Sequence, residues 1–463
     1  MKRPQHIAVI DIGKTNAKLA LVDLGSLTEI AVVTRPNVVL AGPPWPHYDV
    51  DGHWAFLLDA LATFHHDHRV DAISITTHGA CAALLSADGT LAAPILDYEH
   101  EYPAEVVAAY KIIKPDFAET GSPDMIGGLN IGAQLHYQFT TDPTLKNRTE
   151  QIVTYPQFWG HRLTGVGATD VTSLGCHTDL WNPHTATFSD LPATLGIRDK
   201  IAPVRYPSDI LGPILPHIAK ATGLNPNTPV CVGIHDSNAS LYPHIISRDE
   251  PASVISTGTW VIAMSLTGDA ASAIPPLDPA RDTLVNVNAR GQAVPSARFM
   301  GGREYEIIQN GHAYAVTEQD VANVLDRSLM LLPSIESGTG PFQGIAMQWQ
   351  GQEPAFGSGE RAVAVSFYLA LMAGTCLDLI NGAGPTVVEG PFARNAEFVA
   401  MLGSITGRPV VASETATGTS IGAALLFNQD KSWPMPVDAG ISNVGERFST
   451  YIDRWKTSVR SRN

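Results

Sequence analysis

The sequence is poor in the features that mark secreted, membrane and metal–thiolate proteins. It has only four cysteines and no CxxC pair, so we expect neither a zinc site nor a disulfide framework. A reducing cytoplasm is the simpler compartment for such a chain. Its opening residues form a short apolar run that ends at Asp11, which is typical of a strand and not of a signal peptide. The longest apolar stretch, residues 362–374, is shorter than the roughly 20 residues of a membrane span.

Basic residues are also scarce. Lysine and arginine number 30 against 45 aspartates and glutamates, which gives a formal net charge of −15. Nucleic acids and anionic membranes bind to basic faces, so we expect neither as a partner. A small anionic ligand is still compatible with this charge, because a few backbone amides, one lysine and a metal ion can hold it.

The two common nucleotide-binding loops are missing as well. Residues 13–15 read Gly-Lys-Thr, but a Walker A loop would need a glycine where the sequence has Ala8. The GxGxxG fingerprint of dinucleotide-binding folds does not follow the first predicted strand either. If the chain binds a nucleotide, we expect it to use another architecture.

What the sequence does contain is an alternation of strand and helix patterns in two halves. It has 463 residues, 44% of them hydrophobic, so it can bury large cores, and a polar break at residues 248–251 divides it. We predict an α/β protein with domains at 1–247 and 252–430 and a surface tail at 431–463. The main predicted strands are 6–11, 18–23, 29–34, 71–76, 253–255, 260–265, 386–389 and 409–412, and the main predicted helices are 53–65, 101–113, 361–379, 396–406 and 418–427.

The segment 11–16, between the first two predicted strands, is a candidate phosphate-binding turn. Gly13 lets backbone amides turn toward a phosphate, and Asp11 at the strand end could hold Mg²⁺ directly or through water. Side-chain donors and positive charge would come from Thr15, Asn16, and Lys14 or Lys18. A plain β-turn with a solvated lysine fits the same residues.

A second turn of this kind opens the second half. Residues 256–260 read Ser-Thr-Gly-Thr-Trp between two predicted strands, with Gly258 and Thr259 at the tip. Either turn alone could be an ordinary hairpin. Two such turns, each opening one half of the chain, indicate duplicated domains that face one nucleotide across a cleft.

Two further segments carry candidate ligand-binding residues. A predicted strand brings His235 and Asp236 to its end, where Asp236 could act as a general base or simply cap the following helix. In the segment 389–395, Gly390 follows a strand, and its backbone could support a flat ring before a helix begins near Asn395.

Taken together, these segments resemble the FGGY family of carbohydrate kinases, in the right order over residues 6–428. The stretches that carry the resemblance are DIGKTNAKLALVD (11–23), ISITTHGACAALLSADGTLAAPILDYEH (73–100), PQFWGHRLTGVGATDVTSLGCHTDLWNP (156–183), PVCVGIHDSNAS (229–240), VISTGTW (254–260) and VVEGPFARNAEFVAMLGSITGRPVVASETATGTSIGAALL (387–426). The resemblance implies two RNase H-like (actin/hexokinase-type, ASKHA) domains with ATP and a sugar in the cleft between them.

By match of position, the resemblance also implies residue roles. It implies a sugar kinase that transfers the γ-phosphoryl group of ATP to a sugar hydroxyl, with Asp236 as the base and Asp11 organising Mg²⁺. The implied phosphate contacts are Gly13, Thr15, Asn16, Gly258 and Thr259, to which we add Lys18 for its positive charge, and the implied adenosine contacts are Gly390, Pro391 and Asn395.

The sugar region departs from the family pattern. Residues 96–100 read Leu-Asp-Tyr-Glu-His where the family usually has W-x-D-x-R, and no glutamine precedes His78. The GGG that usually precedes the adenosine-binding asparagine is here replaced by residues 389–392, Glu-Gly-Pro-Phe. The candidate sugar contacts are His78, Asp97 and Glu99, together with Asp236. The alternative is a core histidine and two acidic residues of a surface loop.

The STGTW turn and the His235-Asp236 pair resemble the rhamnulokinase and fuculokinase side of the family, which implies a deoxyketose such as L-rhamnulose or L-fuculose as substrate. A pentulose or polyol kinase is the alternative within the family. An actin-like ATPase or nucleotide-gated scaffold, and a sugar-binding pseudokinase, are the alternatives outside it. The sequence leaves open the phosphorylated hydroxyl and the oligomeric state, for which a homodimer is one option.

Overall fold

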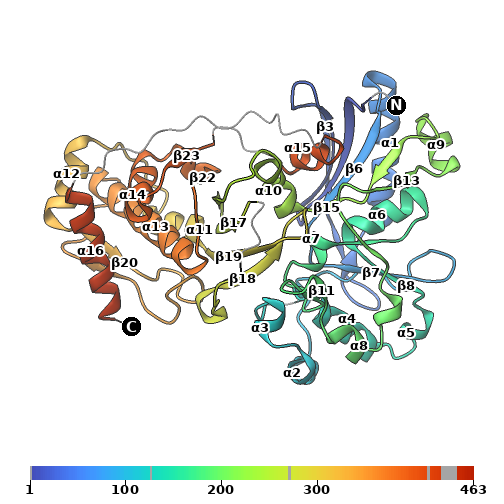
Figure 1. Cartoon of the computed structure of the whole chain (residues 1–463), viewed down its shortest axis with the longest axis horizontal. Coiled ribbons are helices and arrows are strands. Elements are labelled where there is room, and N and C mark those ends of the chain that lie inside the picture. Colours follow the sequence, from blue (N-terminus) through green and yellow to red (C-terminus); the bar gives the residue numbers. More distant parts are fainter. Residues whose placement is uncertain (1–2, 126–127, 269–272, 414–417, 429–445, 463) are drawn as a thin grey trace. The chain divides into compact units, whose positions relative to one another are not determined.

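The computed structural model describes residues 3–125, 128–268, 273–413, 418–428 and 446–462, which divide into two compact units (Figure 1). Unit 1 comprises residues 1–247, 285–293 and 417–433. Unit 2 comprises residues 248–284, 294–416 and 434–463. The chain therefore leaves unit 1 at residue 248 and returns to it twice, whereas the sequence suggested linear domains at 1–247 and 252–430.

A central sheet organises unit 1. Its strands lie in the order β13-β14-β6-β1-β2-β3, and β15 also pairs with β6. The strands β1, β2 and β3 are antiparallel neighbours, whereas β6 runs parallel to β1 and β14 runs parallel to β6. The bounds are β1 His6–Ile12, β2 Asn16–Asp23, β3 Thr28–Pro36, β6 Ala72–Thr77, β13 Ile210–Pro213, β14 Pro229–Cys231 and β15 Ile234–His235.

The strand β1 shows why this sheet is covered on both faces. Alternate residues of a strand point to opposite faces, and here both sets are apolar. Ala8 and Ile10 pack in one core cluster, and Ile7 and Val9 pack in another. Helices α1 (Val50–His68) and α6 (Tyr155–Thr164) contribute to the first cluster, and α10 (Asp236–Ile246) and α15 (Thr419–Ala424) contribute to the second.

The rest of unit 1 consists of short elements, several of them built around a third core cluster. The short strands are β4 Val39–Leu40, β5 His47–Tyr48, β7 Ala82–Leu85, β8 Gln151–Thr154, β9 Thr169–Asp170, β10 Trp181–Asn182, β11 Thr187–Phe188 and β12 Val204–Arg205. The remaining helices are α2 Ala104–Ile113, α3 Phe117–Thr120, α4 Ile131–Thr141, α5 Leu145–Arg148, α7 Val171–Leu174, α8 Leu191–Thr194 and α9 Pro216–Thr222.

Unit 2 repeats the strand scheme of unit 1. Its sheet has the order β18-β19-β17-β16-β22-β23, in which β16, β17 and β19 are antiparallel neighbours and β22 and β23 add in parallel. The bounds are β16 Ala252–Thr257, β17 Val261–Leu266, β18 Thr283–Val287, β19 Ala293–Phe299, β22 Thr386–Glu389 and β23 Val410–Ala412, and a separate hairpin pairs β20 Met330–Leu332 with β21 Gln348–Gln350. The α/β prediction is confirmed in both units.

The helices of unit 2 include one long apolar helix. The helices are α11 Gly301–Gln309, α12 Glu318–Arg327, α13 Gly359–Leu379, α14 Ala396–Thr406 and α16 Glu446–Arg460. By length and composition, α13 is long and apolar enough to cross a membrane. It extends beyond the apolar stretch at residues 362–374 that the sequence indicated. Its side chains are nevertheless mostly buried among those of unit 2, as in the core helix of a globular domain.

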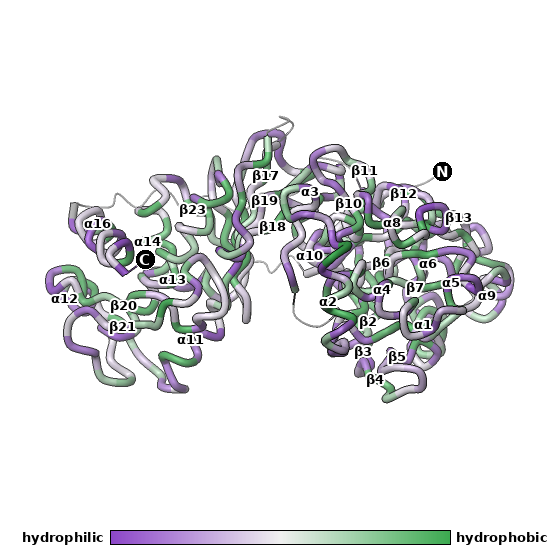
Figure 2. The backbone as a smooth tube through the Cα atoms, turned by 90° about the horizontal axis from the view of Figure 1, so that it is seen from below, coloured by the Kyte–Doolittle hydropathy of each residue, from purple (hydrophilic) through white to green (hydrophobic). Residues whose placement is uncertain are grey.

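The last described helix, α16, corrects the prediction of a surface tail at 431–463. Its apolar and polar residues interleave along the chain, as the hydropathy colouring of Figure 2 shows. Tyr451, Trp455 and Val459 lie on one side at helical spacing and are buried in the core of unit 2. Trp455 also donates its indole N–H to the Leu331 carbonyl at 3.0 Å. The tail prediction is therefore wrong for residues 446–462, while residues 431–445 lie outside the described residues.

Candidate functional site

The turn between β1 and β2 holds the first group of predicted phosphate contacts. The Gly13 N–H donates to the Asn16 carbonyl at 2.9 Å, which closes the turn. Asn37 braces it from the side, with its amide Nδ2 donating to the Gly13 carbonyl at 2.8 Å and its backbone N–H donating to the Thr15 carbonyl at 2.9 Å. Thr15 and Asn16 are exposed, so their polar groups are accessible to a ligand.

Asp11, the predicted magnesium residue, lies at the end of β1 just before this turn. Its Oδ2 accepts from the Thr419 hydroxyl at 2.8 Å and lies 3.2 Å from the Lys18 ammonium. Lys18 is also 3.3 Å from Glu29, so its charge is compensated by two carboxylates and not directed only to a phosphate. Among the described residues, no three acidic, histidine or cysteine side chains cluster as a metal site. One carboxylate completed by phosphate oxygens and water is nevertheless a common magnesium site, so Asp11 fits that ion.

The two lysines that sequence reasoning treated as equivalent have different surroundings. Lys14 leaves the β1–β2 turn and reaches the predicted sugar loop, where its ammonium lies 2.5 Å from Asp97 Oδ1 and 2.9 Å from Glu99 Oε2. The same ammonium sits over the Tyr98 ring, 4.7 Å from its centroid. Lys14 therefore links the candidate phosphate turn to the candidate sugar loop.

Asp97 is 6% exposed, and its two carboxylate oxygens are used differently. Oδ1 accepts from Lys14 at 2.5 Å, from the Tyr48 hydroxyl at 2.9 Å and from the Glu99 N–H at 3.3 Å. Burial opposes the charge of Asp97, but these hydrogen bonds lower the pKa of the carboxyl, so it stays ionised. Within the described part of the chain, Oδ2 accepts no hydrogen bond and is left for another donor.

His78 is a buried imidazole inside an aromatic cage. Its ring lies 5.4 Å from Tyr48, 5.1 Å from Tyr98 and 4.9 Å from Tyr155, measured between centroids. Burial lowers the pKa of His78 to about 4, so the ring is neutral at physiological pH. Neither ring nitrogen has a hydrogen-bond partner among the described residues. Buried polar groups are nearly always paired, so this ring is poised to pair with a ligand.

Asp236 begins α10, immediately after β15. Its Oδ1 accepts from the Ser237 N–H at 2.6 Å and the Ser237 hydroxyl at 3.3 Å, and it lies 3.3 Å from His235 Nε2. The side chain is 31% exposed, and in the described residues no donor reaches Oδ2. Shared neighbours connect Asp236, Asp97 and His78. Tyr48 contacts the His78 ring and donates to Asp97, and Gly79, next to His78, packs on the ring of His235, next to Asp236.

Unit 2 carries the second group of predicted nucleotide contacts, at a backbone-rich turn between β16 and β17. Gly258 and Thr259 are exposed, and the Gly258 N–H donates to the Trp260 carbonyl at 2.9 Å. The first turn of α11 packs against this backbone, since a Cβ added at Gly302 would lie only 2.1 Å from the Gly258 carbonyl oxygen. Only a glycine allows this approach.

The segment after β22 is equally crowded. Gly390 has a left-handed φ of +83°, and a Cβ there would lie 2.0 Å from the Thr257 carbonyl oxygen. The Thr257 hydroxyl donates to the Glu389 carbonyl and accepts from the Phe392 N–H. Pro391 is exposed at the start of the short helix η3 (Pro391–Arg394).

Asn395 caps α14, which accounts for part of its chemistry. Its Oδ1 accepts from the Phe398 N–H at 2.9 Å, and its Nδ2 donates to the Ser366 hydroxyl at 2.9 Å. Its role toward adenosine, like that of Gly390 and Pro391, stays a prediction.

Sequence reasoning missed three aromatic residues of the unit 1 cluster. Tyr48, Tyr98 and Tyr155 surround His78, yet only Tyr98 lies within the loop chosen from the sequence. Tyr98 lies between the candidate residues Asp97 and Glu99 in the sequence, and this position could have identified it as a member of the cluster. Tyr48 and Tyr155 come from β5 and from the start of α6, and nothing in their local sequence indicates that they meet.

Comparison with known proteins gives the same family in both halves of the chain. Residues 6–242 match the model of the N-terminal domain of the FGGY family of carbohydrate kinases. Residues 249–434 match the model of the C-terminal domain of carbohydrate kinase FGGY.

Curated relatives and solved structures agree with these matches. The L-fuculokinase of Salmonella typhi is 25% identical over 270 residues, and the rhamnulokinase of Bacteroides thetaiotaomicron is 21% identical over 268 residues. The aligned region spans only 57% and 54%, respectively, of these relatives' lengths, and 57% and 55% of this chain.

Among solved structures, a carbohydrate kinase from Novosphingobium aromaticivorans is 36% identical, covers 98% of this chain and 100% of its own, and has a TM-score of 0.89. The glycerol kinase of Plasmodium falciparum has the same fold at 13% identity, with a TM-score of 0.77 over 99% of this chain and 98% of its own. The predicted fold with two RNase H-like domains is thereby confirmed.

Proposed function

Because the chain belongs to the FGGY family of carbohydrate kinases, we propose that it transfers the γ-phosphoryl group of ATP to a hydroxyl of a sugar, with Asp236 as general base. One observation carries this proposal. In unit 1, both nitrogens of His78 lack a hydrogen-bond partner among the described residues, the hydrogen bonds to Asp97 and Asp236 all go to Oδ1, and shared neighbours connect the three side chains. A sugar offers several hydroxyls in a small volume, which is what such a set of unpaired groups can bind.

The reaction follows from these groups. Asp236 Oδ2 removes the proton from the acceptor hydroxyl as its oxygen bonds to the γ-phosphorus, while the bond from that phosphorus to the β–γ bridging oxygen breaks and ADP leaves. Asp97 Oδ2 accepts a hydrogen bond from a second hydroxyl, and neutral His78 donates or accepts one more. When bound, Mg²⁺ neutralises phosphate charge, and Asp11 is the residue that would hold it.

Two turns would bind the phosphates of ATP. In unit 1 this is the turn at 13–16, which offers backbone amides, the Thr15 hydroxyl and the Asn16 amide. In unit 2 it is the exposed backbone at Gly258 and Thr259. Gly390, Pro391 and Asn395 of unit 2 would flank the adenosine.

 

For the acceptor we propose a ketose. The first candidates are the deoxyketoses L-fuculose and L-rhamnulose. The names of the curated relatives, L-fuculokinase and rhamnulokinase, support this choice. The ring of Tyr98 supports it as well, because it lies beside His78 and is partly exposed, so it would offer an apolar surface to a methyl group. A pentulose or a polyol is the second candidate acceptor.

A coupled assay of ADP release tests this function. The enzyme is incubated with Mg²⁺-ATP and a panel of ketoses, aldoses and polyols, and each rate is compared with a control without sugar. One strong acceptor would support the proposal, and NMR of the product would then identify the phosphorylated hydroxyl. Equal ADP release with and without every sugar would instead favour an ATPase or a scaffold.

We place the protein in the cytoplasm under the same proposal. Its four cysteines are all buried and free, which suits a reducing compartment. A homodimer stays a prediction, and sedimentation velocity would test it.

A further inference from the structure

Cys176 differs from the other buried cysteines in what it contacts. It is 5% exposed, and its Sγ lies 3.7 Å from Nε2 of His235. Cys81 instead donates to the Leu96 carbonyl, and Cys231 donates to the Ser74 hydroxyl. Cys376, in the helix α13 of unit 2, makes no side-chain hydrogen bond among the described residues. Only at Cys176 does a thiol contact an imidazole, within the described part of the chain.

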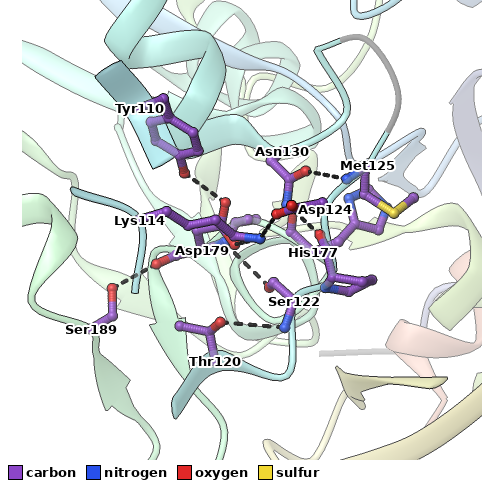
Figure 3. Close-up of polar contacts among 12 residues, drawn as sticks. Tyr110, Lys114, Thr120, Ser122, Asp124, Met125, Asn130, His177, Asp179 and Ser189 are labelled. Carbon is purple, nitrogen blue, oxygen red and sulfur yellow. Dashed lines mark hydrogen bonds and ion pairs between the residues drawn. The ribbon is translucent and has the colours of Figure 1, made fainter. Parts of the chain in front are cut away.

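The turn that carries Cys176 is held firmly in place. It follows α7 and includes two left-handed residues, His177 with φ of +40° and Asp179 with φ of +64°, which non-glycine residues rarely adopt. Asp179 anchors this turn, as Figure 3 shows: its carboxylate accepts from the Tyr110 hydroxyl at 2.6 Å and lies 3.8 Å from the Lys114 ammonium. The Asp179 carbonyl also accepts from the Ser189 hydroxyl at 2.6 Å. Cys176 is therefore a fixed contact for His235.

The ring of His235 is confined on its other side. A Cβ added at Gly79 would lie 2.2 Å from Cδ2 of this ring, so the imidazole packs directly on the glycine backbone. The backbone N–H of His235 donates to the Thr172 hydroxyl at 3.0 Å, and that hydroxyl donates to the buried carboxylate of Asp170. With the ring and the backbone both fixed, Nε2 faces Cys176 at 3.7 Å and Asp236 Oδ1 at 3.3 Å.

We propose that Cys176 and His235 are a positioning pair for Asp236, in which His235 carries a proton on Nε2 and shares it between Cys176 Sγ and Asp236 Oδ1. This inference rests on the proposed function, since it assigns the pair a task in phosphoryl transfer. The shared proton, with the Ser237 N–H, holds Oδ1 and leaves Oδ2 to take the proton of the acceptor hydroxyl. Neither Cys176 nor His235 exchanges a proton with the sugar.

The electrostatics of the surroundings agree with a proton on His235. Burial disfavours its charged form, but Cys176 and Asp236 outweigh burial, and Asp170 adds to them, so the pKa of His235 is raised. Burial likewise disfavours the thiolate, but His177 and His235 lower the pKa of Cys176. His78 is also near His235, but its lowered pKa keeps it neutral, so it adds no positive charge beside His235. Nδ1 of His235 has no partner among the described residues, so Nε2 is the nitrogen that gains from a proton.

The pair is tested first in the wild-type protein, by a measurement that needs no substrate. With ¹⁵N-labelled histidine, NMR should show His235 protonated on Nε2 at neutral pH, and the Cys176→Ala variant should move its titration to lower pH. A His235 resonance protonated on Nδ1 alone would overturn the inference. This measurement is independent of the proposed function, so it distinguishes the failure of one from the failure of the other.

Kinetics then test the task of the pair. In Cys176→Ala, kcat should fall about ten- to a hundredfold while the KM for the sugar changes little, because a base displaced from its position slows only the chemical step. The alkaline limb of the pH profile of kcat should also move to lower pH. His235→Gln, which keeps a donor N–H, should retain more activity than His235→Ala.

Cys376→Ala is the matched control, since it removes a thiol that is equally buried but contacts no histidine. It should leave kcat and the pH profile as in wild type. If Cys176→Ala behaves like Cys376→Ala in an active enzyme, the positioning role is refuted. If the wild-type enzyme phosphorylates no sugar, the proposed function fails, and the NMR result still decides whether the pair exists.

Discussion

The sheets of the two units share one strand scheme, yet they present different chemistry at corresponding positions. Both units begin with an antiparallel hairpin, β1–β2 in unit 1 and β16–β17 in unit 2, followed by a third antiparallel strand and two parallel ones. In unit 1 the first hairpin turn lies near side chains with unpaired oxygens and nitrogens, such as Asp97 and His78. In unit 2 the corresponding turn is surrounded by backbone, where Gly302 and Gly390 allow close approach.

One architecture can therefore serve two kinds of recognition. Side-chain carboxylates and imidazoles distinguish one arrangement of hydroxyls from another, because an unpaired buried partner is costly. Backbone amides bind phosphates and flat rings with less regard to their substituents. Under the proposed function, unit 1 would therefore set the choice of sugar, and unit 2 would bind the nucleotide.

The largest expected effect comes from removing the proposed base from unit 1. Asp236→Asn should lower kcat about 10²- to 10⁴-fold, because the amide cannot take a proton, while nucleotide affinity stays unchanged. Coupled ADP release and calorimetric ADP binding measure the two quantities. Asp190→Asn, at an exposed position without a side-chain cap bond, is the control and should behave as wild type. Normal turnover in Asp236→Asn would remove this residue as the base.

The stability of unit 2 is the next target. Trp455→Ala should cost about 3–5 kcal/mol of unfolding free energy, because it empties a large buried site in α16 and removes a hydrogen bond to Leu331. Denaturant unfolding measures the loss, and Asp453→Ala on the exposed side of the same helix should cost little. Equal stabilities of the two variants would contradict the packing of α16 in the core.

The recognition of the sugar by unit 1 is tested by substituting two neighbouring acidic residues. Asp97→Asn should raise the KM for the sugar about ten- to a hundredfold, since a buried charged acceptor is worth about 1.5–3 kcal/mol. Glu99→Gln should have a much smaller effect, because the Glu99 side chain is 63% exposed and its pairing with Lys14 is screened by water. Steady-state kinetics on the best acceptor of the panel compare the two variants. Similar changes in KM would mean that burial does not distinguish these acids.

Backbone crowding in unit 2 is tested with two left-handed glycines. Gly390→Ala combines an unfavourable φ with a Cβ that would lie 2.0 Å from the Thr257 carbonyl oxygen. Gly407→Ala has the same problem of φ, +63°, but no atom within 4 Å of the added Cβ. Gly390→Ala should therefore lose about 1–3 kcal/mol more stability than Gly407→Ala and should weaken nucleotide binding. Thermal unfolding and ADP titration would show no difference if crowding were unimportant.

Much of the fold could be predicted from the sequence because its signals are local. The buried run at 6–11 and the polar turn after it predicted β1 and the bend, and the helix 396–406 was predicted with its observed bounds. The start of α10 at Asp236 followed from a strand that ends in a polar residue before a small-residue run. Motifs of this kind depend only on neighbours in the chain.

The remaining features depend on contacts between distant segments. Lys14 and Lys18 are equivalent as sequence, but the pairing of β2 with β3 places Lys18 beside Glu29, whereas Lys14 meets Asp97. The three tyrosines around His78 come from β5, from the loop that holds Tyr98 and from α6. The helix α16 was missed because its charged residues dominate the composition, although Tyr451, Trp455 and Val459 follow helical spacing. A spacing test along the last residues would have found it.

The return of residues 417–433 to unit 1 bears on how the protein is made. The helix α15 packs against α10 so closely that a Cβ at Gly422 would lie 1.8 Å from the Ala239 carbonyl oxygen, and the Ala423 carbonyl accepts from the Ser74 hydroxyl at 2.6 Å. A ribosome must therefore synthesise most of unit 2 before the first unit can close its core. A nascent chain of 1–247 would leave uncovered the apolar face on which α15 packs, so we expect the first half of the chain to complete its core only after α15 is made.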